Sequence, residues 1–137
     1  MKNSSKILAI DPGKNKWGCA VLDNTGGVIE RGIFSTNSLY PSIERLVKKH
    51  SITCLVLGNG THSKEFERVL IEIGCEIIFV EEYGSTQEAR NLFDHYYPPS
   101  GWRRWLPKGF RIPDRDYDDL SAIVIGRRYL EGLPGAE

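Results

Sequence analysis

The order of short apolar runs along the chain constrains its fold more than any other feature of the sequence. Three runs follow one another with only turns between them, and two further runs each come after a segment with helical spacing. Strands joined by tight turns pair antiparallel, whereas a strand reached through a helix pairs parallel. The order predicts an α/β domain with a mixed five-stranded sheet, three antiparallel strands and then two parallel ones. The expected strands are Lys6–Asp11, Trp17–Asp23, Val28–Phe34, Thr53–Leu57 and Glu76–Val80.

Four segments carry the apolar spacing of helices, which predicts helices on both faces of the sheet. They lie around 43–50, 66–73 and 85–97 and over about 116–131. Gly74 ends the second helix, and Ser85–Glu88 matches a capping box at the start of the third. The last helix is apolar nearly all round from Leu120 to Ile125, which predicts burial against the sheet. Because 137 residues suit one domain, we expect a single domain over 1–137.

The cysteines and the apolar runs limit where such a chain works. No apolar run approaches the ~18–20 residues of a membrane span, so we expect no membrane partner. Cys19, Cys54 and Cys75 are well separated and form no C-x-x-C pair. This arrangement favours free thiols in a reducing compartment, and we expect the cytoplasm.

The charge balance is neutral as a whole but uneven along the chain. The 18 basic side chains equal the 18 acidic ones, which argues against a protein coated with positive charge for nucleic acid. Residues 101–115, however, contain five basic side chains against one acidic one, within a proline-rich and aromatic loop at 97–115. Cations neutralise phosphates and aromatic rings stack on unpaired bases, so this loop is a candidate nucleic-acid contact. The alternative is a loop whose tryptophans fold back onto the core. The candidate binding residues are Trp102, Arg103, Arg104, Trp105, Lys108 and Arg111.

Acidic side chains stand at three element ends. Asp11 ends the first expected strand, Glu81 and Glu82 end the fifth, and Asp118 and Asp119 begin the last helix. If the first and fifth strands are parallel, these groups converge on one crevice at the edge of the sheet. Neighbouring carboxylates stay ionised together only with a cation among them, and oxygen ligands select Mg²⁺ or Mn²⁺. Two such ions ~3.5–4 Å apart support in-line hydrolysis of a phosphodiester.

Each acidic position also has an ordinary structural explanation. Asp11 precedes Pro12-Gly13 and suits a turn, and Glu81-Glu82 suits a solvated strand end. Asp118-Asp119 suits the positive end of a helix dipole. The conjunction of all three favours a metal site.

Together these residues resemble the RuvC/YqgF superfamily of RNase H-like nucleases. Ile10–Gly13, followed by Lys16 and Gly18, is similar to the opening strand pair of that superfamily. Val80–Arg90 resembles the YqgF segment written as Asp-Glu-Arg, two residues, Thr, one residue, Glu-Ala. Asp118–Ala122 resembles the family's final Asp at the start of its last helix. The three motifs occur in the family's order and span nearly the whole chain.

The resemblance implies an RNase H-like fold and a nuclease that uses Mg²⁺ or Mn²⁺, with two ions, on structured nucleic acid. It implies that Asp11, Glu82 and Asp118 are the catalytic and metal-binding residues. Glu81 and Asp119 are further candidate ligands, and Lys16 is a candidate phosphate contact. For the YqgF branch the implied substrate is the precursor of 16S ribosomal RNA, with Holliday-junction resolution on branched DNA as the alternative.

Two departures from the family pattern support a rival function. Tyr83 stands where the YqgF segment usually has Arg, and Ser121 stands where the RuvC branch has a further Asp. A nucleic-acid-binding module without catalysis would keep the fold and the basic loop but lack a working metal site. A second rival, an actin-like phosphotransferase, shares a similar Asp-x-Gly hairpin, but those enzymes close two such domains around the nucleotide.

Overall fold

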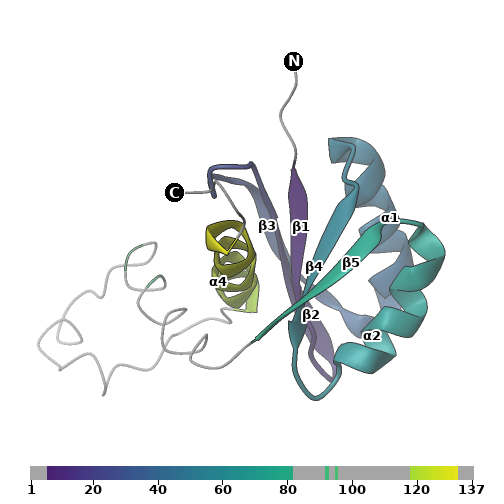
Figure 1. Ribbon diagram of the computed structural model, residues 1–137. Coiled ribbons are helices and arrows are strands. Elements are labelled where there is room, and N and C mark those ends of the chain that lie inside the picture. The colour runs from purple at the N-terminus through teal and green to yellow at the C-terminus, as the bar shows by residue number, and fades with distance from the viewer. Residues whose placement is uncertain (1–5, 82–91, 93–94, 96–117, 133–137) are drawn as a thin grey trace, which may run out of the picture.

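The computed structural model describes residues 6–81, 92, 95 and 118–132, which contain one five-stranded sheet with helices on both faces (Figure 1). The strand order is β3-β2-β1-β4-β5. β1 pairs antiparallel with β2 and parallel with β4, β2 pairs antiparallel with β3, and β4 pairs parallel with β5. The strands are β1 Ile7–Asp11, β2 Lys16–Leu22, β3 Val28–Ser35, β4 Cys54–Asn59 and β5 Glu76–Glu81. The predicted α/β class is confirmed, and β1 and β5 run in the same direction.

The helices form two layers around this sheet. α1 (Leu39–His50) and α2 (Ser63–Leu70) cover one face, and α4 (Asp118–Glu131) covers the other (Figure 1). Short 3-10 turns, η1 (Thr36–Ser38) and η2 (Ile71–Ile73), precede α1 and follow α2. The predicted second helix therefore ends in a 3-10 turn before Gly74, whose φ of 92° terminates it.

Strand alternation divides the core into two clusters. In β1, Leu8 and Ile10 pack with the apolar side of α1 and α2, whereas Ile7 and Ala9 pack with α4. The α4 segment from Leu120 to Ile125 is buried throughout, as its uniform apolar character predicts. Within the described residues, both faces of the sheet are covered by helices, and the candidate acids Asp11 and Glu81 lie at the end of the sheet where β1 and β5 finish.

Some predictions fall on residues outside the described part. These are most of the third predicted helix (85–97), the basic loop at 97–115, and Glu82. Leu92, from the apolar stripe of that helix, is described and packs against the α4-side cluster. Within the described residues, no helix is both long and apolar enough to cross a membrane. The three cysteines are free thiols, with Cys19 and Cys54 buried.

Candidate functional site

Asp11 is the last residue of β1, at the end of the sheet where β1, β4 and β5 all finish. Its register partner in β2 is Gly18. Because alternate residues of a strand share a face, Asp11 and Gly18 lie on the same face as Ala9 and Ala20, which pack against α4. The Asp11 carboxylate therefore lies at the end of the α4 face, in a half-buried position.

The beginning of α4 lies directly on Gly18. A methyl group built on Gly18 would come within 2.1 Å of the carbonyl carbon and oxygen of Asp118. Paired Cα atoms of neighbouring antiparallel strands are ~4.5–5.5 Å apart, so Asp11 is one strand away from this contact. Gly18 thus lets the backbone of the first α4 turn reach the sheet, where the Asp118 backbone lies one strand away from Asp11.

Asp119 is engaged by a residue of β3. A carboxylate oxygen of Asp119 lies 2.5 Å from Nη1 of Arg31, and the other accepts a hydrogen bond from the Leu120 amide at 2.9 Å. Asp119 is buried, so this contact holds its carboxylate toward β3. As a candidate metal ligand, Asp119 is therefore already engaged by a guanidinium partner.

Glu81 lies at the exposed end of β5, paired with Asn59 of β4. The alternation that puts Val80 with the α4-side cluster puts Glu81 with Ile77, which packs against the other cluster. Its backbone carbonyl accepts a hydrogen bond from Nη1 of Arg128 at 2.8 Å. The structure therefore does not bring Glu81 to the face that Asp11 occupies, and Glu82 lies outside the described residues.

The candidate nucleic-acid contacts are described only at Lys16. It is the exposed first residue of β2, and alternation places it on the same face as Gly18. Lys16 therefore lies two residues along β2 from Gly18, the register partner of Asp11. The other candidates, Trp102, Arg103, Arg104, Trp105, Lys108 and Arg111, lie outside the described part of the chain.

The turn after β4 is a helix entry rather than a phosphate loop. The Gly60 carbonyl accepts hydrogen bonds from the amide and the hydroxyl of Ser63, at 3.3 and 2.9 Å, which sets the start of α2. His62 stands at the N-cap of α2, with Nδ1 3.0 Å from Oε1 of Glu65. This contact between near neighbours in the sequence explains His62 as a helix-start residue.

Cys19 is close to the site in sequence but lies on the opposite face. Burial, followed by the negative charges of Glu30 and Asp119, raises the pKa of its thiol to about 12. A thiol with such a pKa stays protonated at neutral pH and is a poor nucleophile or metal ligand. Cys19 is therefore a core residue, and the polar chemistry belongs to the carboxylates.

Sequence reasoning missed Arg31, which holds the residue next to Asp118. The only local signal is a charged side chain within β3 at a position that alternation assigns to the α4 face. Its partner, Asp119, lies 88 residues away along the chain. Contacts at such separations leave no periodic pattern in the sequence.

The donor set around Gly18 suits a hard divalent cation. Within residues 6–81, 92, 95 and 118–132, no group of three His, Cys, Asp or Glu side chains is arranged to hold a metal. Asp11 and Asp118 supply carboxylate oxygens only, and Mg²⁺ is commonly held by one or two carboxylates, together with waters and substrate phosphates. The described residues therefore fit Mg²⁺ as a partial ligand set.

A family comparison identifies the kind of domain that this chain forms. The model of the Tex protein YqgF-like domain matches residues 5–95, about two thirds of the chain. The chain belongs to the Tex protein YqgF-like domain family. The predicted relation to YqgF and RuvC proteins is thereby confirmed at the level of the family.

Relatives of this YqgF-like chain are much longer proteins. An uncharacterized protein of Neisseria meningitidis serogroup B is 32% identical over 138 residues, which cover 92% of this chain. The transcriptional accessory protein Tex of Neisseria gonorrhoeae is 34% identical over 70 residues, which cover 48% of this chain and 9% of that protein. The aligned region spans only 16% of the length of the N. meningitidis protein.

Solved structures place the YqgF-like chain in the RNase H-like fold. A Thermus thermophilus RuvC structure matches with a TM-score of 0.56 at 9% identity, covering 88% of this chain and 90% of that one. RuvC from the same organism in complex with a Holliday junction substrate matches with a TM-score of 0.52 at 10% identity, covering 88% and 89%. At such identities the likeness shows the fold, which is the predicted RNase H-like one.

Proposed function

We propose that this YqgF-like domain is a Mg²⁺-dependent endonuclease that hydrolyses phosphodiester bonds in structured nucleic acid. The observation that carries the proposal is the approach of α4 to Gly18, which joins the ends of β1 and α4 and with them Asp11 and Asp118. Carboxylates from β1 and α4 that hold a metal together, on a fold shared with RuvC, would support metal-assisted phosphodiester hydrolysis.

The roles of the residues follow from their positions. Asp11 and Asp118 would hold the divalent ions, with Glu82 completing the set. When bound, Mg²⁺ or Mn²⁺, with two ions in the full site, offsets the negative charge that develops on the phosphate in the transition state. Lys16, exposed beside this pair, would hold a neighbouring phosphate of the strand.

The beginning of α4 adds a favourable field to the same point. The positive end of a helix dipole stabilises negative charge, and α4 has 14 residues with Asp118 in its first position. This field favours both the ionised Asp118 carboxylate and a substrate phosphate.

The substrate we propose is structured RNA, with the 16S ribosomal RNA precursor as the first candidate, because the chain has the YqgF-type sequence motifs. Branched DNA is the alternative, since the RuvC structure of this fold was determined with a Holliday junction substrate. The basic and aromatic residues of the 97–115 loop, Arg103 and Trp102 among them, would bind the nucleic-acid strand. We further propose that residues 1–137 form one domain that acts in the cytoplasm, consistent with its three free cysteines.

The direct test compares cleavage of precursor 16S ribosomal RNA and of four-way DNA junctions, with Mg²⁺ and with chelator. Asp11→Asn and Asp118→Asn keep the size of the side chain and remove the charge, and both should abolish cleavage. Glu44→Gln, on the exposed side of α1 with Lys48 as its partner, is the matched control and should cut like the wild type. Equal cleavage by the wild type and Asp11→Asn would overturn the proposed mechanism.

A nucleic-acid-binding module without catalysis is the second candidate. It is favoured by the incomplete ligand set among the described residues, which contain no three-member metal group. It also suits a domain whose relative is named a transcriptional accessory protein. This candidate predicts that RNA or junction binding survives chelation and that no products form with Mg²⁺, whereas the nuclease predicts products that vanish with chelator.

A further inference from the structure

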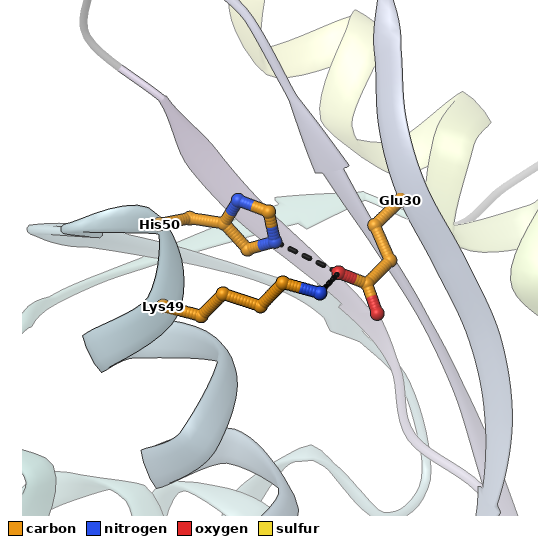
Figure 2. A network of polar contacts seen from close by, with 3 residues as sticks. All are labelled: Glu30, Lys49 and His50. Atoms are coloured by element: carbon orange, nitrogen blue, oxygen red, sulfur yellow. Dashed lines mark hydrogen bonds and ion pairs between the residues drawn. The ribbon is translucent and has the colours of Figure 1, made fainter.

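Two neighbouring residues of β3 form ion pairs on opposite faces of the sheet. Glu30 pairs with Val21 in the strand register and turns toward α1, where Lys49 and His50 contact its carboxylate at 3.1 and 2.8 Å (Figure 2). Arg31 pairs with Ala20 and turns toward α4, where it contacts Asp119. One strand therefore ties down a helix on each side, but only the Arg31 contact is next to a candidate site residue.

The Arg31–Asp119 contact is well shielded from solvent. The exposed fractions of the two side chains are 25% for Arg31 and 9% for Asp119. An ion pair in such surroundings is screened less by water and salt than one on the surface. Separating the two side chains would leave each charge partly buried without its partner, which is costly. The cost holds Arg31 and Asp119 against each other.

The place of this contact gives it a particular consequence. Asp119 immediately follows Asp118, and the register partner of Arg31, Ala20, is two residues along β2 from Gly18. At Gly18 the backbone of Asp118 lies against the bare backbone of β2, and the Arg31–Asp119 ion pair is a side-chain contact that fixes this first turn over the sheet. The far half of α4 is held by close packing at Gly126 against Leu22 and Ala9.

We propose that Arg31 is a positioning residue of the metal site: its ion pair with Asp119 holds the first turn of α4 so that Asp118 faces Asp11. This inference rests on the proposed function, because it assigns Arg31 a role toward the divalent ion. Arg31 binds no metal itself, since it offers only donors. It acts through the backbone that Asp119 shares with Asp118.

Electrostatics and positioning predict opposite signs for one substitution. Arg31→Ala removes a positive charge near the carboxylates and releases Asp119, so charge alone would tighten the binding of a cation. If Arg31 positions Asp118, the same variant weakens binding instead. A tenfold to hundredfold loss is typical when a residue that orients a metal ligand is removed.

The experiment measures Mn²⁺ binding by electron paramagnetic resonance, together with the Tm, for the full chain and its variants. Arg31→Ala should weaken Mn²⁺ binding at least about tenfold. Arg31→Lys, which can still reach Asp119 with one donor, should recover part of that loss. The double variant Arg31→Ala/Asp119→Asn should bind no more weakly than the weaker single variant, because both changes break one contact.

Glu30→Gln is the matched control, since it breaks an ion pair of the adjacent residue on the other face. It should lower the Tm and leave Mn²⁺ binding within twofold of the wild type. Binding by Arg31→Ala that is unchanged or tighter overturns the positioning role, as does a Glu30→Gln variant that loses as much affinity. A wild type that binds no Mn²⁺, or whose binding survives Asp11→Asn, overturns instead the metal site of the proposed function.

Discussion

The two faces of the sheet differ most at the end where β1 finishes. On the α1 and α2 face, this end is closed by large, fully buried side chains, Ile10, Trp17 and Leu57. On the α4 face, the same level carries Asp11 and Gly18, an acid and a residue without a side chain. On the first face the end of the sheet is packed with side chains, whereas on the second the α4 backbone packs directly on Gly18 beside the acidic Asp11.

This difference separates the residues that stabilise the fold from the candidate site residue Asp11. The ring centroids of Trp17 and Phe34 lie 5.2 Å apart, and Nε1 of Trp17 donates a hydrogen bond to the Ser35 carbonyl at 3.1 Å. These contacts close the core on the α1 side. No comparable aromatic closure is described around Asp11. Substitutions on the two faces should therefore separate stability from activity, and four of them test that separation.

The largest effect is expected from Asp11→Asn. Loss of the charge that would hold the divalent ion should reduce cleavage by at least about a thousandfold, or ~4 kcal/mol of transition-state stabilisation. Folding should be little affected, because Asp11 is half-buried at a strand end. Initial rates with Mg²⁺ and urea unfolding of the same samples measure both. A variant that unfolds but still cuts would reverse the assignment of the two faces.

Ile43→Ala should have the next largest effect, and on stability alone. Ile43 of α1 is fully buried in the core on the other face, so its truncation should cost ~2–5 kcal/mol of unfolding free energy. The folded fraction should keep wild-type cleavage and Mn²⁺ affinity. Denaturant titration and cleavage at low temperature provide the readouts. Loss of metal affinity in the folded variant would mean that the two faces are coupled.

Gly18→Ala should affect both properties moderately. The added methyl group would overlap the Asp118 backbone, so α4 must lift away, at a cost of ~1–3 kcal/mol in stability. A displacement of about 1 Å between site groups lowers rates by roughly a hundredfold. Gly74→Ala is a control at a glycine with no atom near the added methyl group; its positive φ makes it strained, so it should lose stability but not cleavage. Full cleavage by Gly18→Ala would show that Asp118 does not depend on this contact.

The smallest effect is expected at Glu30. Hydrogen bonds from His50 and then from Lys49 lower the pKa of its carboxyl group below its usual value. A lowered pKa in the folded state contributes stability above the unfolded-state pKa, near 4.3, and loses it as the pH falls through the folded-state pKa. Because the groups are partly exposed, the contribution should be below about 1 kcal/mol.

Urea unfolding at pH 6 and pH 3 of the wild type and Glu30→Gln tests this expectation. The variant should show a smaller loss of stability on acidification. A remaining loss is expected from Asp23, whose pKa is lowered first by the Thr25 hydroxyl and then by the Gly27 and Thr25 amides in the β2–β3 turn. An identical loss of stability on acidification in both proteins would show that the Glu30 contacts in Figure 2 do not contribute to stability.

Most of the fold could be predicted from local patterns. Alternation and helical spacing identified each described strand, with differences of one or two residues at the ends. β4, for example, continues to Asn59 because it pairs with β5 as far as Glu81. The uniform apolar run of α4 predicted its burial, because a helix without a polar side must be covered.

The candidate site was only partly open to such reasoning. Asp11 and Asp118 could be picked out because the ends of strands and helices in this class of fold lie beside a common crevice. Glu81 and Asp119 could not be assigned in the same way. Strand parity and an ion pair decided their places: Glu81 lies on the face opposite Asp11, and Asp119 is paired with Arg31.

Local chemistry in the chain thus settled which segments become strands and helices, and which acids stand at their ends. Where those acids lie relative to one another depended on the assembled molecule, through the bare backbone of Gly18 beneath α4 and the ion pair of Arg31 with Asp119. The physical reason is the separation of the contacting residues along the chain. Periodicity records contacts within a few residues, whereas the approach of positions 31 and 119 arises only when burial brings the layers together.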